Sequence, residues 1–220
     1  MRLTVPTATA RTACAESVVG FVRAVDALSE LDLLGASRCH GWTRMDVMVH
    51  VIAGWEDMLG GLVSSVDAEP TVDAATYWPA FAAEFVADDP IPALMAQRRR
   101  STTYLRPASA TRHLHEVADA LLRGIASLPR GNCLWQGHVF TAGDFLTVWA
   151  VEDVVHHLDL RSEDPAPDSA LALARATIEA LVGEPLPTGW TDLEATLIGT
   201  GREPVPEDGG AIRDRFPALG

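Results

Sequence analysis

The sequence has few cysteines, and their spacing argues against two structural roles. The three of them, Cys14, Cys39 and Cys133, lie far apart and form no C-x-x-C pair. An odd number at wide spacing is not the pattern of a disulfide framework or of a thiolate zinc site. We interpret Cys14 as a small core residue on a helix, and a reactive-thiol role for any of the three is the minority interpretation.

Basic charge is also scarce. Lys and Arg together number 17 against 30 Asp and Glu, which gives a formal net charge of −13. Nucleic acids and anionic membranes are bound through clustered basic side chains, so neither is an expected partner. The single basic run, Arg98–Arg100, is interpreted as a solvated helix face.

Long hydrophobic runs are missing as well. No stretch approaches the roughly 18 apolar residues that a membrane span needs, and residues 1–15 hold no apolar core of the signal-peptide type. We therefore expect a cytoplasmic protein. With 220 residues, 48% of them hydrophobic, the chain is long and apolar enough for one domain, or for one domain with a small appendage.

What the sequence does contain is helical periodicity, with apolar residues recurring every three to four positions. Residues 66–76 interrupt it as an acidic, proline-containing crossover, and residues 133–140 are expected to be an extended loop or short strand. Residues 193–198 are a candidate strand. A mainly α fold is predicted, with helices at 9–34, 44–64, 77–86, 91–104, 108–128, 142–160 and 169–182.

Two of these helices carry polar side chains on faces that should be buried. His50 lies beside the apolar stripe of the helix at 44–64, where a lone histidine is more often a hydrogen-bonded core residue than a ligand. Glu152 and His156, four residues apart on the helix at 142–160, share one face and can converge on one point. Their neighbours Asp153 and His157 point about 100° away and are weaker ligand candidates.

A divalent metal would compensate the burial of these groups. Helix bundles build metal sites from side chains on facing helices, and two imidazoles with one carboxylate suit zinc first, and also nickel, cobalt, manganese or ferrous iron. Three protein ligands would leave one open position, as in catalytic zinc sites. The H-E-x-x-H pattern of zinc proteases is absent. Spacing alone leaves a second interpretation open, a hydrogen-bonded His–Glu pair in the core.

Two segments resemble a known family. Residues 41–51, Gly-Trp-Thr-Arg-Met-Asp-Val-Met-Val-His-Val, are similar to the second-helix motif of the DinB-like superfamily, and more closely to that of the mycothiol-dependent maleylpyruvate isomerase family. Residues 144–160, with their E-x-x-x-H-x-x-D-L pattern, resemble the last bundle helix of that family. The resemblance covers roughly the first 160 residues, with both motifs in the same order.

The resemblance implies a DinB-like four-helix bundle with a long crossover after the second helix, over residues 1–164. Residues 165–220 would form a short extension, with a helix and a small irregular or strand-containing tail. His50, Glu152 and His156 would be the metal ligands. Asp159 is a candidate for orienting an imidazole, although contact with Arg161 or solvent is an equal alternative. Family members carry a larger C-terminal α/β domain with an arginine implicated in substrate binding, and Arg202 is a weak candidate for that role.

The family chemistry uses mycothiol, a low-molecular-weight thiol that a divalent metal can deprotonate at neutral pH. The leading hypothesis is therefore a metal-dependent, mycothiol-using isomerase or S-transferase acting on a small electrophile. The alternatives are a non-catalytic DinB-like protein that binds a metal, ligand or partner, and a metal-free bundle. A homodimer is plausible for a small bundle of this kind.

Overall fold

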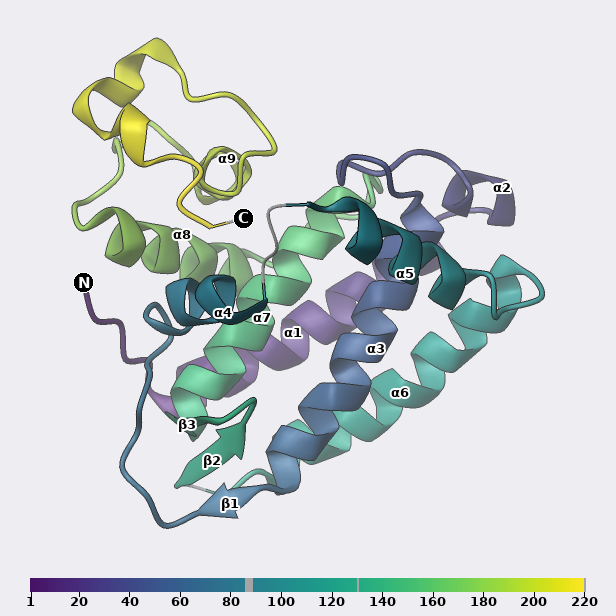
Figure 1. Cartoon of the computed structure of the whole chain (residues 1–220), viewed down its shortest axis with the longest axis horizontal. Helices are drawn as coiled ribbons and strands as arrows, with labels where there is room; N and C mark the ends of the chain where they lie inside the picture. Colours follow the sequence, from purple (N-terminus) through teal and green to yellow (C-terminus); the bar gives the residue numbers. More distant parts are fainter. Residues whose placement is uncertain (86–88, 130, 220) are drawn as a thin grey trace.

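Four long helices pack side by side in the computed structural model, which describes residues 1–85, 89–129 and 131–219 (Figure 1). Helix α1 contacts both α6 and α7, and α3 completes the ring by contacting the same two helices. The prediction of a mainly α, four-helix bundle is thereby confirmed. The four helices are α1 (Thr7–Asp26), α3 (Arg44–Val63), α6 (Pro107–Ser127) and α7 (Ala142–Asp159).

Side-chain caps set the starts of the two helices that matter most for the site. The Thr43 hydroxyl accepts the backbone N–H of Asp46, and the Asp46 carboxylate accepts the backbone N–H of Thr43, which is a capping box at the start of α3. Thr141 accepts the backbone N–H of Asp144 in the same way at the start of α7. Local sequence therefore places His50 in the second turn of one helix and Glu152 in the third turn of another.

The predicted helix at 9–34 is wrong in its second half. Helix α1 ends at Asp26, and a short helix α2 (Glu30–Leu33) follows it. The Ser29 hydroxyl accepts the N–H of Asp32 while the Asp32 carboxylate accepts the N–H of Ser29, so a new capping box starts there. Apolar periodicity runs across this break, which is why the two helices were predicted as one.

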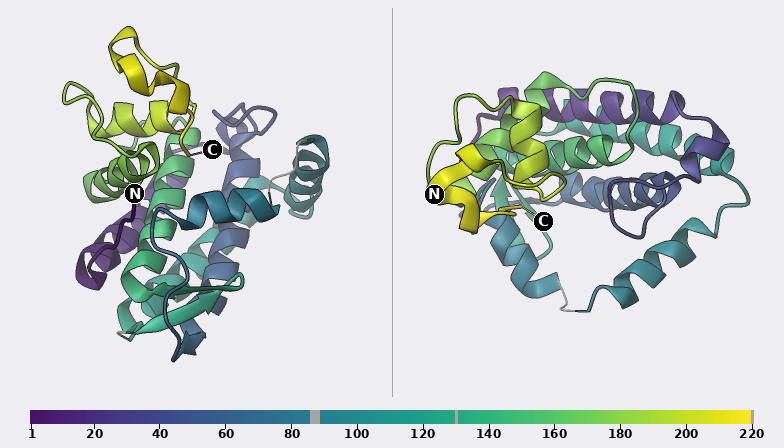
Figure 2. Two further views of the ribbon diagram at one scale, coloured as in Figure 1. Left: turned by 60° about the vertical axis from the view of Figure 1, so that its left-hand side comes forward. Right: turned by 90° about the horizontal axis from the view of Figure 1, so that it is seen from above.

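The long crossover between α3 and α6 contains strand β1 (Ser65–Val66) and helices α4 (Tyr77–Phe85) and α5 (Ile91–Ser101). Both helices lie outside the bundle, and α4 crosses in front of α7 (Figure 2). The predicted helix end at Val86 and the predicted break at Asp88 lie outside the described residues. Helices α4 and α5 of the crossover therefore cover one face of α3 and α7.

A small antiparallel sheet closes one end of the bundle. Strands β2 (Asn132–Trp135) and β3 (His138–Thr141) form a hairpin, and β1 pairs with β2 in the order β1-β2-β3. The prediction of an extended segment at 133–140 is confirmed. The hairpin holds the Trp135 side chain against Phe145 and Trp149 of α7, with ring centroids 5.7 and 5.1 Å apart.

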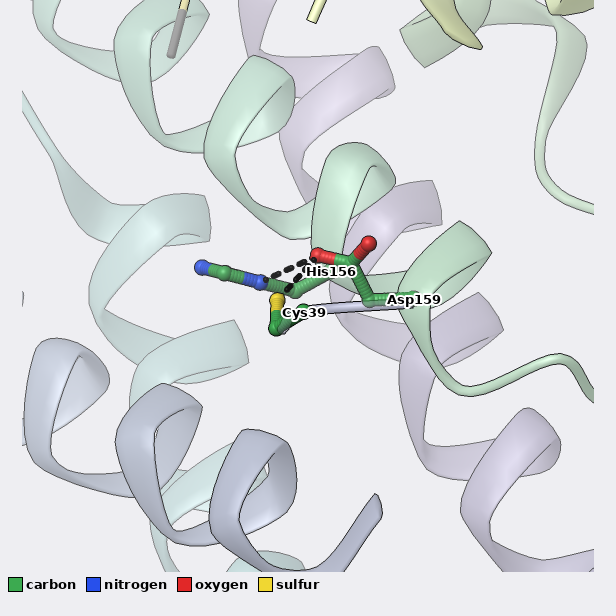
Figure 3. A group of neighbouring side chains, drawn as sticks. All are labelled: Cys39, His156 and Asp159. Atoms are coloured by element: carbon green, nitrogen blue, oxygen red, sulfur yellow. Dashed lines mark hydrogen bonds and ion pairs between the residues drawn. The ribbon is translucent and has the colours of Figure 1, made fainter. Parts of the chain in front are cut away.

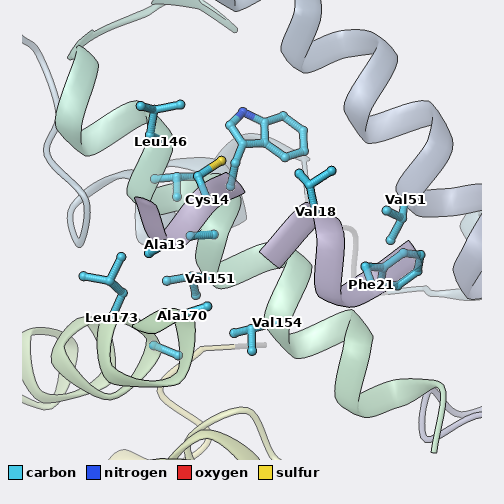
Figure 4. Close-up of a cluster of buried hydrophobic side chains, with 14 of the residues drawn as sticks. Ala13, Cys14, Val18, Phe21, Val51, Leu146, Val151, Val154, Ala170 and Leu173 are labelled. Atoms are coloured by element: carbon cyan, nitrogen blue, oxygen red, sulfur yellow. The ribbon is translucent and has the colours of Figure 1, made fainter. Parts of the chain in front are cut away.

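The core lies between α1, α3 and α7 and continues onto helix α8 (Asp168–Val182) (Figure 4). Cys14 is fully buried in it, as predicted, and burial raises the pKa of its thiol well above the ordinary value. Apart from aromatic rings such as that of Phe21, the labelled side chains in this part of the core are small or branched. Those labelled in Figure 4 are Ala13, Cys14, Val18, Phe21, Val51, Leu146, Val151, Val154, Ala170 and Leu173.

Residues after α7 form α8, α9 (Asp192–Gly199) and a 3-10 segment η1 (Glu207–Arg215). The strand predicted at 193–198 is wrong, because Thr191 and Glu194 form a capping box that starts a helix there. In its described residues this tail is helical or irregular. Helix α8 packs on α1 and α7, and α9 packs on α8. These contacts join the tail to the bundle and do not test the domain boundary at residues 164 and 165, which stays a prediction.

None of the helices described here is both long enough and apolar enough to cross a bilayer.

Candidate metal centre

His50 of α3 and the pair Glu152 and His156 of α7 converge between the two helices. The Nε2 atom of His156 lies 3.1 Å from Oε1 of Glu152, and Nε2 of His50 lies 3.4 Å from the same oxygen. The two imidazole rings meet edge to face, with centroids 4.7 Å apart. One ligand atom from each residue lies within 4.8 Å of the others, so the three could surround a single ion.

Asp159 orients the His156 ring from its other side. The two groups are one helical turn apart, and His156 Nδ1 lies 3.0 Å from Asp159 Oδ2. Figure 3 shows this contact between His156 and Asp159. The Asp159 carboxylate is fully buried and also faces Arg202. An ionised carboxylate only accepts hydrogen bonds, so Nδ1 carries a proton and donates a hydrogen bond to Asp159. In the neutral form of His156, this tautomer leaves the lone pair of Nε2 directed toward Glu152.

The charges of the three groups are strongly coupled. Burial alone would raise the pKa of Glu152, but His156 and His50 beside it lower that pKa below its ordinary value. Burial alone would lower the pKa of His156, but Glu152, Asp159 and Cys39 around it raise that pKa well above its ordinary value. The pKa of His50 is lowered, mainly by burial. The centre therefore favours a positive group opposite Glu152, either protonated His156 or a bound cation.

The donor set fits a divalent metal. A neutral His156 and an ionised Glu152 would turn lone pairs toward each other at 3.1 Å, and a cation between them removes this repulsion. Two imidazole nitrogens and one carboxylate oxygen are the ligand types that zinc accepts in catalytic sites. The carboxylate–histidine contact from Asp159 to His156 is the usual support for such a ligand.

Arg202, in the segment after α9, contacts the Asp159 carboxylate that supports His156. Its Nε and Nη2 atoms donate to the two oxygens of Asp159 at 3.1 and 3.0 Å, and Nη1 donates to the carbonyl of Thr200 at 2.9 Å. Burial alone would raise the pKa of Asp159, but hydrogen bonds from His156 and Arg202 lower it below its ordinary value. Arg202 thus holds Asp159 ionised and aligned, and acts on the centre through it.

Cys39 is a neighbour of the centre that its sequence position did not indicate. Its thiol lies 3.0 Å from Asp159 Oδ2, and Cys39, His156 and Asp159 form a second group of possible ligands (Figure 3). This second group suits a metal less well, because Arg202 already occupies both oxygens of Asp159. No local spacing links Cys39 to residues more than a hundred positions away, so only folding could reveal this contact.

Two cavities meet at the centre, and both include His50 and Glu152 in their walls. The hairpin-side cavity, about 250 Å³, extends toward β2 and β3 and ends at Trp135 and Gln136. The extension-side cavity, about 640 Å³, extends the other way, toward Arg202 and the last residues described. Trp78 and Phe81 of α4 line both, so the crossover forms a shared wall.

The described site contains more aromatic side chains than its sequence motifs indicated. Tyr77, Trp78, Trp135 and Trp149 reach it from α4, β2 and α7. Of the residues proposed from the sequence, Asp153 and His157 lie on another face of α7, where they contact α1, α3 and the turn after α7. Arg202 and Asp159, the two weaker candidates, lie beside the centre.

Comparison with known proteins agrees with the fold. A family model described as the mycothiol maleylpyruvate isomerase N-terminal domain matches residues 14–161. The chain is similar to a crystal structure of the mycothiol-dependent maleylpyruvate isomerase, with 18% identity and a TM-score of 0.56, and to one of its histidine-to-alanine variant, with 17% identity and a TM-score of 0.55. Each alignment covers 80% of this chain and 72% of the other. These likenesses show the fold. No curated protein matches the chain.

Proposed function

Because the chain belongs to the mycothiol maleylpyruvate isomerase N-terminal domain family, we propose that it is a metal-dependent enzyme that uses mycothiol on a small electrophilic substrate. One observation carries the proposal. Three donor atoms, from His50, Glu152 and His156, lie within 4.8 Å of one another at the junction of two cavities. A junction of this kind offers separate room for a thiol and for an electrophile.

His50, Glu152 and His156 would hold a divalent ion, and zinc is the best match to these ligand types. When bound, the ion acts as a Lewis acid and stabilises a thiolate at neutral pH. The protein's own groups prepare the site for it. Asp159 keeps the proton of His156 on Nδ1 and the lone pair on Nε2, and Arg202 keeps Asp159 ionised.

Apolar side chains form part of the cavity walls. Trp42, Trp78 and Val155 lie beside the centre on the extension side. The side chains of His50 and Glu152 stay 35% and 32% exposed, so a thiol can reach them from the cavities. An ion held by His50, Glu152 and His156 alone would have room to bind the thiol sulfur as well.

The reaction follows from a thiolate held next to an electron-poor double bond. The sulfur forms a C–S bond, and the π electrons move onto the activating carbonyl of the substrate. Rotation about the resulting single bond and cleavage of the same C–S bond return the thiolate and the isomerised alkene. If the adduct takes up a proton instead, the C–S bond remains and the reaction is S-transfer. Both outcomes begin with the same step.

A non-catalytic, metal-binding protein is the second candidate, and the position of Arg202 favours it. Its guanidinium is bound to Asp159 and to the carbonyl of Thr200, so only part of its donor capacity faces the extension-side cavity. A residue bound in this way supports the metal centre in the absence of any substrate. The experiment that tests the proposed function must therefore measure metal and chemistry separately.

The test measures metal content by elemental analysis, and then thiol consumption and isomerisation over a panel of electron-poor alkenes with mycothiol. We expect about one divalent ion per chain, loss of both metal and activity in His50→Ala, and neither loss in the surface control His115→Ala, which contacts Asp26 on the outside of the bundle. Metal without any thiol-dependent chemistry would support the non-catalytic candidate. Unchanged metal content in His50→Ala would contradict the metal centre itself.

A further inference from the structure

The extension-side cavity has a mostly apolar wall. Its volume of about 640 Å³ lies within the roughly 300–1,000 Å³ that encloses a small-molecule ligand. Apolar side chains from the bundle, the crossover and the tail share its lining, among them Trp42, Trp78, Phe81, Val155, Leu181 and Leu219. Transfer of apolar surface out of water is favourable, so a ligand with an apolar body gains most from filling this volume.

Basic charge in this wall is already paired. Of the described residues that line it, Arg202 is the sole arginine or lysine. Its Nε and Nη2 atoms donate to both oxygens of the buried Asp159, at 3.1 and 3.0 Å, and its side chain is only 18% exposed. A ligand carboxylate seated away from the metal centre would therefore lose its hydration without gaining an unpaired basic side chain.

The hairpin-side cavity, by contrast, has a basic side chain with a neutral partner. Arg100 of α5 lines it, and its Nη1 atom donates to the amide oxygen of Gln97 at 3.0 Å. Gln97 in turn donates to the backbone carbonyl of Asp46 at 2.8 Å, so these bonds bring no carboxylate to the guanidinium. An anionic group of a ligand is better placed on the hairpin side, and an apolar group on the extension side.

Part of the apolar wall comes from the tail after α7. Leu181 lies on α8, and Leu219 is buried, with its backbone N–H donating to the carbonyl of Gly199 at 3.0 Å. Gly199 packs so closely on α8 that a Cβ atom there would collide with Ile178. The family model matches residues 14–161 and so includes neither leucine. The apolar character of this wall is therefore a property of this chain that does not follow from its family.

We propose that the extension-side cavity selects an uncharged electrophile, an alkene activated by a ketone and carrying an alkyl or aryl group in place of a carboxylate. The inference rests on the proposed function in that this alkene accepts the thiolate. Its carbonyl end lies beside His50 and Glu152, which the two cavities share, and its apolar group packs on Leu181 and Leu219. These two leucines thereby determine specificity.

The first experiment measures binding without chemistry. Two saturated methyl ketones, 4-phenylbutan-2-one and 4-oxopentanoate, are titrated into the full chain with and without zinc, and isothermal titration calorimetry records their binding. We expect the phenyl ketone to bind in both states. In the zinc-free chain it should bind roughly tenfold more tightly than the carboxylate, since no unpaired basic side chain offsets the carboxylate's loss of water.

Substitutions in the wall show where the phenyl ketone lies. Leu181→Ser and Leu219→Ser each remove apolar surface from the wall and should weaken binding of the phenyl ketone roughly threefold to tenfold. The backbone bond from Leu219 to Gly199 does not need the side chain, so Leu219→Ser should fold. Leu193→Ser changes an exposed leucine on α9 that lines neither cavity, and this matched control should bind as wild type.

The second experiment measures turnover with mycothiol and zinc over three alkenes that share a methyl ketone. They are 3-penten-2-one, 3-nonen-2-one and 4-oxo-2-pentenoate, and each rate is divided by that of the uncatalysed thiol addition. We expect kcat/KM to rise roughly twofold to fourfold for each added methylene, and to be lowest for the carboxylate. Leu219→Arg adds an unpaired cation to the wall and should raise the rate with 4-oxo-2-pentenoate relative to that with 3-penten-2-one.

The two readouts separate this inference from the proposed function. Binding of the phenyl ketone without turnover of any alkene would contradict the proposed function and support the apolar specificity of the cavity. Turnover that is fastest with 4-oxo-2-pentenoate, or equal binding of the two ketones by the zinc-free chain, would overturn the inference. Unchanged binding of the phenyl ketone in both Leu181→Ser and Leu219→Ser would overturn it as well.

Discussion

Helix α7 carries two acid–histidine pairs at the same spacing, and the tertiary structure gives them opposite environments. Glu152 and His156 face α3, where His50 adds a third donor beside two cavities. Asp153 and His157, one residue further along the helix, are turned about 100° away. They are almost completely buried, with 1% and 2% of their surface exposed, and they do not meet each other.

The second pair meets no third metal-binding side chain, and the buried Nδ1 atom of His157 has no hydrogen-bond partner among the described residues. Asp153 accepts hydrogen bonds from the Ser17 hydroxyl at 3.0 Å and from the Trp55 indole at 2.8 Å. His157 Nε2 donates to the carbonyl of Asp164 at 2.9 Å. Burial raises the pKa of Asp153 to about 7, so this carboxyl holds a proton where Glu152 does not. The comparison shows that E-x-x-x-H spacing makes a metal centre only where a third donor and open space coincide.

The largest expected difference between the pairs is in metal binding. His156→Ala removes a ligand from the centre, so bound zinc should fall from about one per chain to the background level. His157→Ala removes a side chain that hydrogen-bonds to the turn after α7 and is not one of the three proposed ligands, so zinc content should stay near that of wild type. Elemental analysis of both proteins after dialysis measures this. Equal zinc loss in the two variants would mean that the pairs are not distinguished as we infer.

A smaller change in metal affinity is expected from the support of His156. Asp159→Asn removes the charge that Arg202 and His156 share, and loss of such a partner typically costs 10–100-fold in metal affinity. Competition with a chromogenic chelator measures the dissociation constant. Glu163→Gln changes an exposed carboxylate four residues later and is the matched control. An affinity in Asp159→Asn equal to that of the control would contradict the supporting role.

The smallest expected effect concerns the pH dependence of stability. The pKa of Asp153 is about 7 in the folded chain and about 3.9 in an unfolded one. The folded state therefore keeps a proton that the unfolded state has released, and the free energy of unfolding falls between pH 4 and pH 7, by on the order of 1 kcal/mol per pH unit at most. Above pH 7 this contribution is lost and the curve is flat.

Asp153→Asn should remove this slope. The amide can donate to Ser17, whose hydroxyl already lies 2.8 Å from the carbonyl of Cys14, and can accept from Trp55, so every hydrogen bond survives. Its stability relative to wild type should therefore be least favourable near pH 4 and most favourable at pH 7 and above. Urea unfolding of both proteins over this range measures the difference. A difference that does not vary with pH would show that Asp153 is ionised in the fold.

Much of the bundle could be predicted from local patterns, and the errors have a common cause. The capping box at Thr43, the N-cap at Thr141 and the apolar periodicity of α3 and α7 depend on residues a few positions apart. The break between α1 and α2 and the helix α9 depend on capping boxes of the same kind, at Ser29 and Thr191, which apolar periodicity alone obscured. Both could have been found by searching for S/T-x-x-D/E as well as for apolar spacing.

The sequence by itself determined which side chains share a face of a helix, because the α-helix repeats every 3.6 residues whatever surrounds it. It thus paired Glu152 with His156, and it paired Asp153 with His157 equally well. Only the tertiary structure decided which pair meets His50, that Arg202 and Cys39 contact Asp159, and that Gln136 lies at the end of an aromatic cavity. These contacts join residues 43 to 120 positions apart, and packing of whole helices, which no local spacing encodes, brings them together.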